Sequence, residues 1–160
     1  MAQILTAKRQ MFDFPRRTER IVSNIVFMGQ GEPFYNYRNV KKALQLISDP
    51  AGIAISKRRI TVSTSGILPN IKRLGEDFPG INLAISLHAV TDELRDAIVP
   101  ANRQWPLAEL LEACRNFPGL TPMRRIAFEY VMLKGVNDSE ADARELVRLL
   151  NGFPSFVNII

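Results

Sequence analysis

Apolar residues follow two alternating patterns along the chain. Short continuous runs predict β-strands, and segments in which apolar residues recur every three or four positions predict helices with one buried face. The predicted strands are residues 21–28, 59–64, 81–87, 125–133 and 156–160. The predicted helices are residues 4–12, 40–47, 69–74, 91–98, 106–114 and 139–150. Because a helix stands between each pair of successive strands, we expect an α/β fold with a parallel sheet.

Within the predicted strands, one face is apolar and the other is polar or small. The apolar set would pack under the helices: Ile60, Val62, Leu83, Ile85, Leu87, Phe128 and Tyr130. The other set alternates with it: Thr61, Ser63, Ala84, Ser86, His88, Ala127 and Glu129. A parallel sheet that helices cover on both sides is apolar on both faces. The alternation therefore favours a partial β/α barrel with a partly polar interior, and a sheet with one solvated face is the alternative.

The first predicted strand ends abruptly in Gly29-Gln30-Gly31-Glu32-Pro33. Glycines let the backbone approach a ligand closely, and the Glu32 carboxylate could receive an ammonium group. Several polar residues of the other strands also stand toward the carboxyl ends, which form the ligand-binding edge of parallel α/β folds. We therefore predict a ligand site at this edge, whereas a simple turn after the strand is the alternative.

Three further side chains could carry chemistry, and each has a structural alternative. His88 could exchange a proton near neutral pH, or it could be an ordinary hydrogen-bonded histidine. A Glu129 carboxylate inside an apolar strand needs a cation, a polar ligand or water, and Arg125 on the same face is a possible partner. Cys114 lies on an apolar helix face, which favours a packed core thiol over a nucleophile.

Composition and charge narrow the function classes. The formal net charge is +5 and the pI is about 9.7, with basic clusters at Arg16, Arg17 and Arg20 and at Lys57, Arg58 and Arg59. Such clusters suit a polyanionic partner, although an ordinary basic surface explains them equally well. The single cysteine excludes an internal disulfide and fits a reducing compartment. No segment reaches the roughly 18 apolar residues of a membrane span, so we expect a cytoplasmic protein.

Five segments together resemble successive motifs of the RlmN-type radical S-adenosylmethionine (SAM) RNA methyltransferases. They are FMGQGEPFYNYRNV, ISKRRITVSTSG, LAISLHAVTDELRDAIVPANR, FEYVMLKGVNDS and FVNII, in order from about residue 23 to residue 160. The resemblance implies a radical SAM partial β/α barrel, incomplete at both ends. It also implies methylation of C2 of an adenine in 23S ribosomal RNA and in tRNA. The implied partners are these RNAs and an electron donor protein, with no membrane.

Matched residue by residue, the resemblance places Gly31 and Glu32 at the methionine end of SAM. It adds Ser63, Ser86, Leu87 and His88 as cofactor-binding residues. The family holds a 4Fe–4S cluster with three cysteines of a CxxxCxxC loop, because thiolates bind iron and support electron transfer. It uses further cysteines for methyl transfer. None of these cysteines has a counterpart here, so we expect no metal ligand and no catalytic residue in this chain.

These observations predict two regions. Residues 1–20 are expected to form an N-terminal helix and a basic loop, and residues 21–160 the central part of a radical SAM core domain. The chain alone is expected to be inactive as a methyltransferase. Two alternatives stay open, namely a noncatalytic SAM- or RNA-binding remnant and a TIM-like metabolic enzyme that uses Glu32, His88 and Glu129 for acid–base chemistry.

Overall fold

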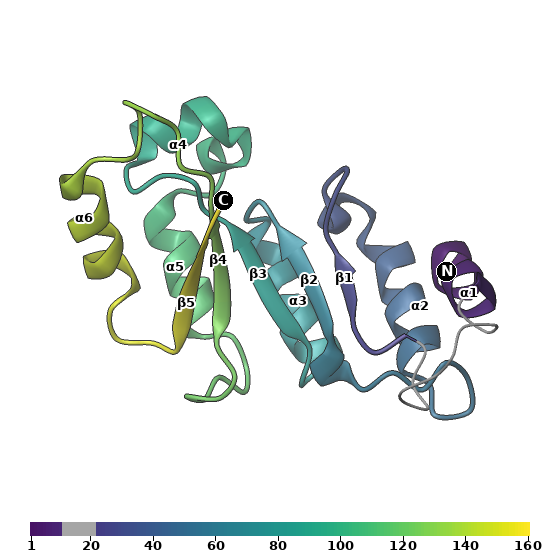
Figure 1. Cartoon of the computed structure of the whole chain (residues 1–160). Coiled ribbons are helices and arrows are strands. Elements are labelled where there is room, and N and C mark those ends of the chain that lie inside the picture. Colours follow the sequence, from purple (N-terminus) through teal and green to yellow (C-terminus); the bar gives the residue numbers. More distant parts are fainter. Residues whose placement is uncertain (11–21) are drawn as a thin grey trace.

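The computed structural model describes residues 1–10 and 22–160, which form an α/β fold around one parallel sheet (Figure 1). The strands are β1 (Ile25–Phe27), β2 (Ile60–Thr64), β3 (Asn82–Ser86), β4 (Ile126–Tyr130) and β5 (Ser155–Ile159). The helices are α1 (Ala2–Gln10), α2 (Tyr37–Ser48), α3 (Leu68–Asp77), α4 (Asp92–Ile98), α5 (Leu107–Arg115) and α6 (Glu140–Leu150). The strands pair in the order β1-β2-β3-β4-β5, and every pair is parallel.

The sheet confirms the prediction of a partial β/α barrel. Among the described residues, β1 and β5 each pair with one strand only, so the sheet stays open. Figure 1 shows the helices α2, α3, α5 and α6 along the sheet, with α4 at the end where the strands finish. The predicted basic loop, with Arg16, Arg17 and Arg20, lies outside the described residues.

Local sequence signals account for the helix starts. The Thr91 hydroxyl accepts a hydrogen bond from the Leu94 amide at the start of α4. Ser139 and Asp142 form a reciprocal capping box at the start of α6, and Pro69 lies in the first turn of α3. Such caps satisfy amides that the helix leaves unpaired. The sequence did not predict three short 3-10 turns, Pro33–Asn36, Lys57–Arg59 and Pro100–Arg103.

The core lies between the sheet and the helices, as the apolar parity predicted. All seven residues of the predicted apolar strand face are buried: Ile60, Val62, Leu83, Ile85, Leu87, Phe128 and Tyr130. Leu44 of α2, Leu74 of α3 and Leu110 of α5 are fully buried in the same cluster. Helix α3 packs so closely that a Cβ on Gly75 would stand 2.5 Å from Pro118 Cδ.

The opposite strand face is less covered. Thr61, Ser63, Ser86 and Glu129 are half-buried, whereas the small residues Ala84 and Ala127 are buried. The polar residues therefore gather on one side of the sheet, toward the carboxyl ends of the strands.

None of the helices in residues 1–10 and 22–160 combines the length and the apolar character that a membrane crossing requires.

Candidate cofactor site

The carboxyl ends of the strands surround a cavity of about 570 Å³. Five of the six predicted cofactor-binding residues line it: Gly31, Glu32, Ser63, Ser86 and His88. They lie at or just after the carboxyl ends of β1, β2 and β3, which are neighbours in the sheet. A volume of this size suits a small-molecule ligand. The structure therefore brings together residues that are up to 57 positions apart in the sequence, from Gly31 to His88.

Glu32 connects the end of β1 to the end of β2. Its Oε1 accepts a hydrogen bond from the Phe34 amide at 2.9 Å. Its Oε2 accepts hydrogen bonds from the Ser65 amide at 2.7 Å and from the Ser65 hydroxyl at 2.8 Å. A carboxylate offers about four acceptor sites, so three are engaged by the protein. The remaining acceptor capacity is available to a ligand with a donor group.

The loop before Glu32 depends on glycine. Gly29 has φ +131° and Gly31 has φ +79°, and both values are in the region that side chains disfavour. No atom lies within 4 Å of a Cβ added at either position. The requirement for glycine here is therefore one of backbone conformation, not of space.

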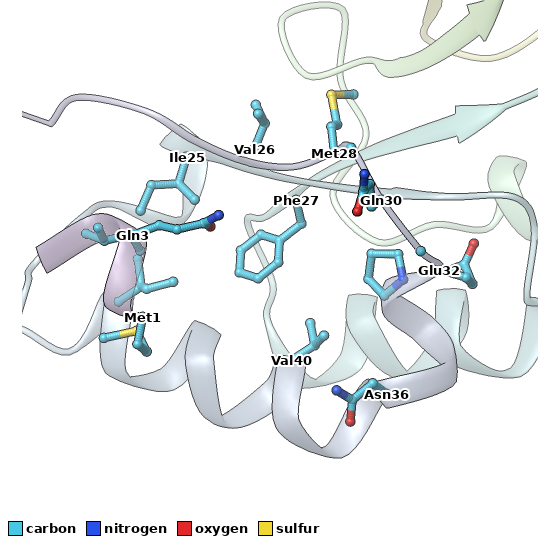
Figure 2. A pocket seen from close by; sticks show the side chains of 15 residues that line it. Met1, Gln3, Ile25, Val26, Phe27, Met28, Gln30, Glu32, Asn36 and Val40 are labelled. Carbon is cyan, nitrogen blue, oxygen red and sulfur yellow. The ribbon is translucent and has the colours of Figure 1, made fainter. Parts of the chain in front are cut away.

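A second cavity, of about 700 Å³, lies on the other side of this loop, next to β1, α1 and α2. Figure 2 shows Phe27 and Val40 pointing into it, with Gln30 and Glu32 on the loop where β1 ends. Of the predicted cofactor-binding residues, it contains only Gly31 and Glu32. Although it is larger, it does not bring the predicted site residues together.

His88 is held in a fixed orientation. Its φ is +60°, an uncommon value for a residue with a side chain. Its Nδ1 accepts a hydrogen bond from the Val131 amide at 3.1 Å, which assigns the ring proton to Nε2. Burial lowers the pKa of His88, and the nearby Arg95 charge lowers it further. The imidazole is therefore neutral near pH 7, with Nε2–H as the donor that is left for a ligand.

Asn137 connects the loops that follow β3 and β4 through hydrogen bonds. It is buried, and its Nδ2 donates to the His88 carbonyl and to the Val131 carbonyl, both at 2.8 Å. Its Oδ1 accepts from the Leu133 amide at 2.6 Å. All of these groups lie in loops, so the amide side chain replaces the pairing that a sheet would provide. The unusual backbone of His88 is stabilised in this way.

The structure gives Glu129 a different hydrogen-bond partner from the one that the sequence suggested. Asn158 Nδ2 donates to Glu129 Oε2 at 2.8 Å, whereas the Arg125 guanidinium lies over the Phe156 ring at 5.2 Å. In the sheet, Glu129 stands directly opposite Asn158. Arg125 is four residues earlier, about 13 Å along a strand. The neighbouring strand therefore provides the partner, and the pairing with Arg125 was wrong.

Leu87 differs from the other predicted site residues because its side chain is fully buried in the core. Its amide donates to the Glu129 carbonyl at 3.0 Å, and its carbonyl accepts from Arg95 Nε at 3.0 Å.

The buried Arg95, which contacts this segment, was not among the predicted residues. Its sequence setting gave one signal, two carboxylates at positions 92 and 96 on the same helix.

Cys114 is the one cysteine in the sequence, and it is fully buried on α5. Burial raises the pKa of its thiol to about 12, so it is protonated at neutral pH. Residues 1–10 and 22–160 contain no group of three or more His, Cys, Asp or Glu side chains that could hold a metal ion. These residues do not fit an iron–sulfur cluster, which requires thiolate ligands.

Known proteins are similar to this chain in sequence and in structure. The dual-specificity RNA methyltransferase RlmN from Bradyrhizobium sp. (strain BTAi1 / ATCC BAA-1182) is 57% identical over all of this chain. The enzyme of that name from Sinorhizobium fredii is 56% identical. The chain spans about 40% of the length of these relatives. The crystal structure of a radical SAM methyltransferase from Sphaerobacter thermophilus superposes with a TM-score of 0.89 and 46% identity, over 99% of this chain and 45% of that one.

The family assignment follows from the extent of the match. Residues 13–147 match the radical SAM superfamily, and these residues contain β1 to β4 and the loops that form most of the cavity. The strand order and the helix order agree with the fold that the sequence motifs implied. The chain therefore belongs to the radical SAM superfamily.

Proposed function

We propose that this chain is the central part of an RlmN-type radical SAM enzyme, which methylates C2 of adenine in 23S ribosomal RNA and in tRNA in the cytoplasm. The main support is the convergence of Gly31, Glu32, Ser63, Ser86 and His88 on one cavity, in a chain 57% identical to a relative with the name of an RNA methyltransferase. Under this proposal, residues 21–160 are part of the core domain, and residues 1–20 precede it.

The proposed role of the cavity is to bind SAM. The free acceptor capacity of Glu32 suits the ammonium group of the methionine moiety, and the glycine backbone at Gly31 permits close approach. Ser63 and Ser86 offer hydroxyl groups, and the neutral His88 offers Nε2–H. Glu129 also lines the cavity, and such a mixture of two carboxylates and several uncharged donors suits a ligand with positively charged groups and a ribose.

The iron–sulfur cluster is expected elsewhere in the complete enzyme. The thiol of Cys114 is buried and protonated at neutral pH, and the described residues hold no other group suited to iron. Under the proposal, the cluster ligands, the methyl-carrying cysteine and the contact with an electron donor protein belong to parts of the enzyme outside this chain. The role of this chain is to bind and orient SAM.

The net charge of +5 suits an RNA partner, and one basic cluster lies at the amino end of β2, away from the cavity at its carboxyl end. Lys57, Arg58 and Arg59 form a basic cluster immediately before β2. Lys57 lies over the Phe78 ring at 5.7 Å, and Arg59 donates to the Ser23 carbonyl at 3.5 Å. Neither contact neutralises the positive charge. Phosphate contacts of such residues make RNA affinity fall steeply with salt.

Exchange of segments tests the proposed activity. In the Bradyrhizobium relative, the aligned segment is replaced by this chain, and methylated adenosine is measured in RNA digests by mass spectrometry. The graft is expected to be active, and Glu32→Ala within it is expected to abolish most of the product. Glu140→Ala, on the exposed face of α6, is the matched control and should stay active. An inactive but folded graft that binds SAM would instead favour the noncatalytic remnant.

The metabolic-enzyme alternative makes a different prediction for the chain itself. An acid–base enzyme that uses Glu32, His88 and Glu129 has no need of SAM. Isothermal titration of the chain with SAM, with ATP as the control ligand, therefore separates the two functions. Saturable binding of SAM alone supports the proposal, whereas no heat with SAM would contradict the cofactor assignment. Membership of the radical SAM superfamily already argues against the metabolic enzyme.

A further inference from the structure

Arg95 is completely buried in α4. Its Nε donates to the Leu87 carbonyl at 3.0 Å, and its Nη1 donates to Asn102 Oδ1 at 2.9 Å. Its Nη2 donates to two carbonyls, that of Ser65 at 2.7 Å and that of Ser86 at 2.9 Å. The guanidinium is thus surrounded by neutral acceptors. Burial lowers the pKa of Arg95 to about 10, so the group is still charged at neutral pH.

A second layer holds the arginine in place. Asn102, which is also buried, donates from Nδ2 to Asp92 Oδ1 at 2.9 Å and to Asp96 Oδ1 at 2.7 Å. Asp92 Oδ1 also accepts from the Leu107 amide at 2.8 Å, where α5 begins. The two carboxylates balance the arginine charge through Asn102. A buried polar network in which every group is satisfied fixes a single geometry.

The three carbonyls that Arg95 contacts belong to the segments that line the candidate cofactor cavity. Ser65 donates both its amide and its hydroxyl to Glu32, so Arg95 is connected through Ser65 to the loop after β1. Ser86 is itself a cavity residue, and Leu87 immediately precedes His88. One side chain therefore connects the ends of β2 and β3 directly, and the end of β1 through Ser65 and Glu32. Arg95 itself does not line the cavity.

Arginine has the chemistry for this role. Three carbonyl oxygens that converge in the interior are costly to bury unless hydrogen-bond donors lie between them. The guanidinium provides planar donors in a fixed arrangement, so it sets the spacing of its acceptors. Lysine would keep the charge but not the planar arrangement of donors. Methionine would keep only the bulk of the side chain.

We propose that Arg95 is the positioning residue of the cofactor site, which holds the ends of β1, β2 and β3 in the relative positions that SAM binding requires. The ligand named here rests on the proposed function, but the positioning of the three segments does not. The inference assigns Asn102, Asp92 and Asp96 as the group that orients Arg95.

The test compares Arg95→Lys and Arg95→Met with the wild-type chain in three measurements. The first is SAM affinity by isothermal titration. The second is hydrogen exchange of the Ser65 amide, which donates to Glu32. The third is the NMR titration of His88, which is the one histidine in the sequence. Arg144→Lys and Arg144→Met are the matched controls, because Arg144 is an exposed arginine that pairs with Glu140 on α6.

Both Arg95 variants are expected to speed exchange of the Ser65 amide and to weaken SAM binding on the order of tenfold to a hundredfold, since small misplacements of a site are costly. The His88 pKa should rise in Arg95→Met, which removes a nearby charge, and change little in Arg95→Lys. A folded Arg95→Lys chain with wild-type Ser65 exchange and wild-type SAM affinity would overturn the proposal.

The experiment separates failure of the proposed function from failure of the positioning role. If the wild-type chain does not bind SAM but Arg95→Lys still speeds Ser65 exchange, the proposed function fails and the positioning role stands. If neither Arg95 variant folds, Asp96→Asn replaces them, because it weakens the support of Asn102 without emptying the arginine site. Faster Ser65 exchange in Asp96→Asn supports the proposal, and unchanged exchange contradicts it.

Discussion

Replacement of Glu32 by glutamine should destabilise the fold as well as the cofactor site. The carboxylate accepts three hydrogen bonds, from the Phe34 amide and from the amide and hydroxyl of Ser65, at 2.7 to 2.9 Å. Glutamine has one acceptor oxygen, so at least one donor loses its partner. Hydrogen bonds to charged groups contribute about 1.5–3 kcal/mol each. Because Glu32 is half-buried, we expect a loss of about 1–3 kcal/mol in the free energy of unfolding.

Urea denaturation followed by circular dichroism measures this loss. With a slope of about 2 kcal/mol per molar urea, the midpoint should fall by about 0.5–1.5 M. Glu32→Asp keeps the charge but shortens the reach, so it should give an intermediate shift. Glu140→Gln is the control, because its surface pair with Arg144 contributes little. If Glu32→Gln unfolds at the wild-type midpoint, Glu32 does not connect β1 to β2 in solution, and the reasoning is refuted.

Three further predictions test other parts of the structure. Burial lowers the pKa of His88, so the unfolded chain binds more protons below about pH 6.5, and stability should be lost as the pH falls through this range. Urea melts at pH 7.5 and 5.5 check this, and an unchanged pH dependence in His88→Asn would contradict it. Gly31→Ala and Gly135→Ala place alanine at φ +79° and +72°, so each should cost about 1–2 kcal/mol of unfolding free energy. Only Gly31→Ala should weaken SAM binding in titrations, and equal affinities would argue against the site. Gly75→Ala should lower the unfolding free energy by about 1–3 kcal/mol despite its better helix propensity, because the new Cβ meets Pro118; a higher urea midpoint would mean that the neighbouring loop yields.

The sequence predicted the fold well because the apolar faces of strands and helices are local patterns. Four of the five predicted strands contain an observed strand, and β5 (Ser155–Ile159) is offset by one residue from the predicted 156–160. The predicted helices that begin at Thr91 and Ser139 are capped by these residues. The first four observed strands are shorter than predicted, since pairing with a neighbour, and not apolar character, decides where a strand ends. Residues 25–27 pair in β1, for example, within the predicted run 21–28.

The candidate site was predicted only in part. Gly31, Glu32 and His88 stand beside strand ends, and their positions follow from the strands. Arg95 and Asn137 could not be found in this way, because arginine and asparagine usually lie on surfaces. Their burial depends on carbonyl groups of distant loops, which no sequence period encodes. The mistaken partner of Glu129 has the same origin, since cross-strand neighbours depend on sheet register.

The strand order has a consequence for how the chain folds during synthesis. Each strand pairs with the strand that precedes it in the sequence, as Thr61 pairs with Asn82 and Ala84 pairs with Ala127. From β2 onward, a strand that leaves the ribosome therefore finds the neighbour before it already made, and each of these pairings joins strands that are consecutive in the sequence. The sheet can grow one β/α unit at a time, in the direction of translation.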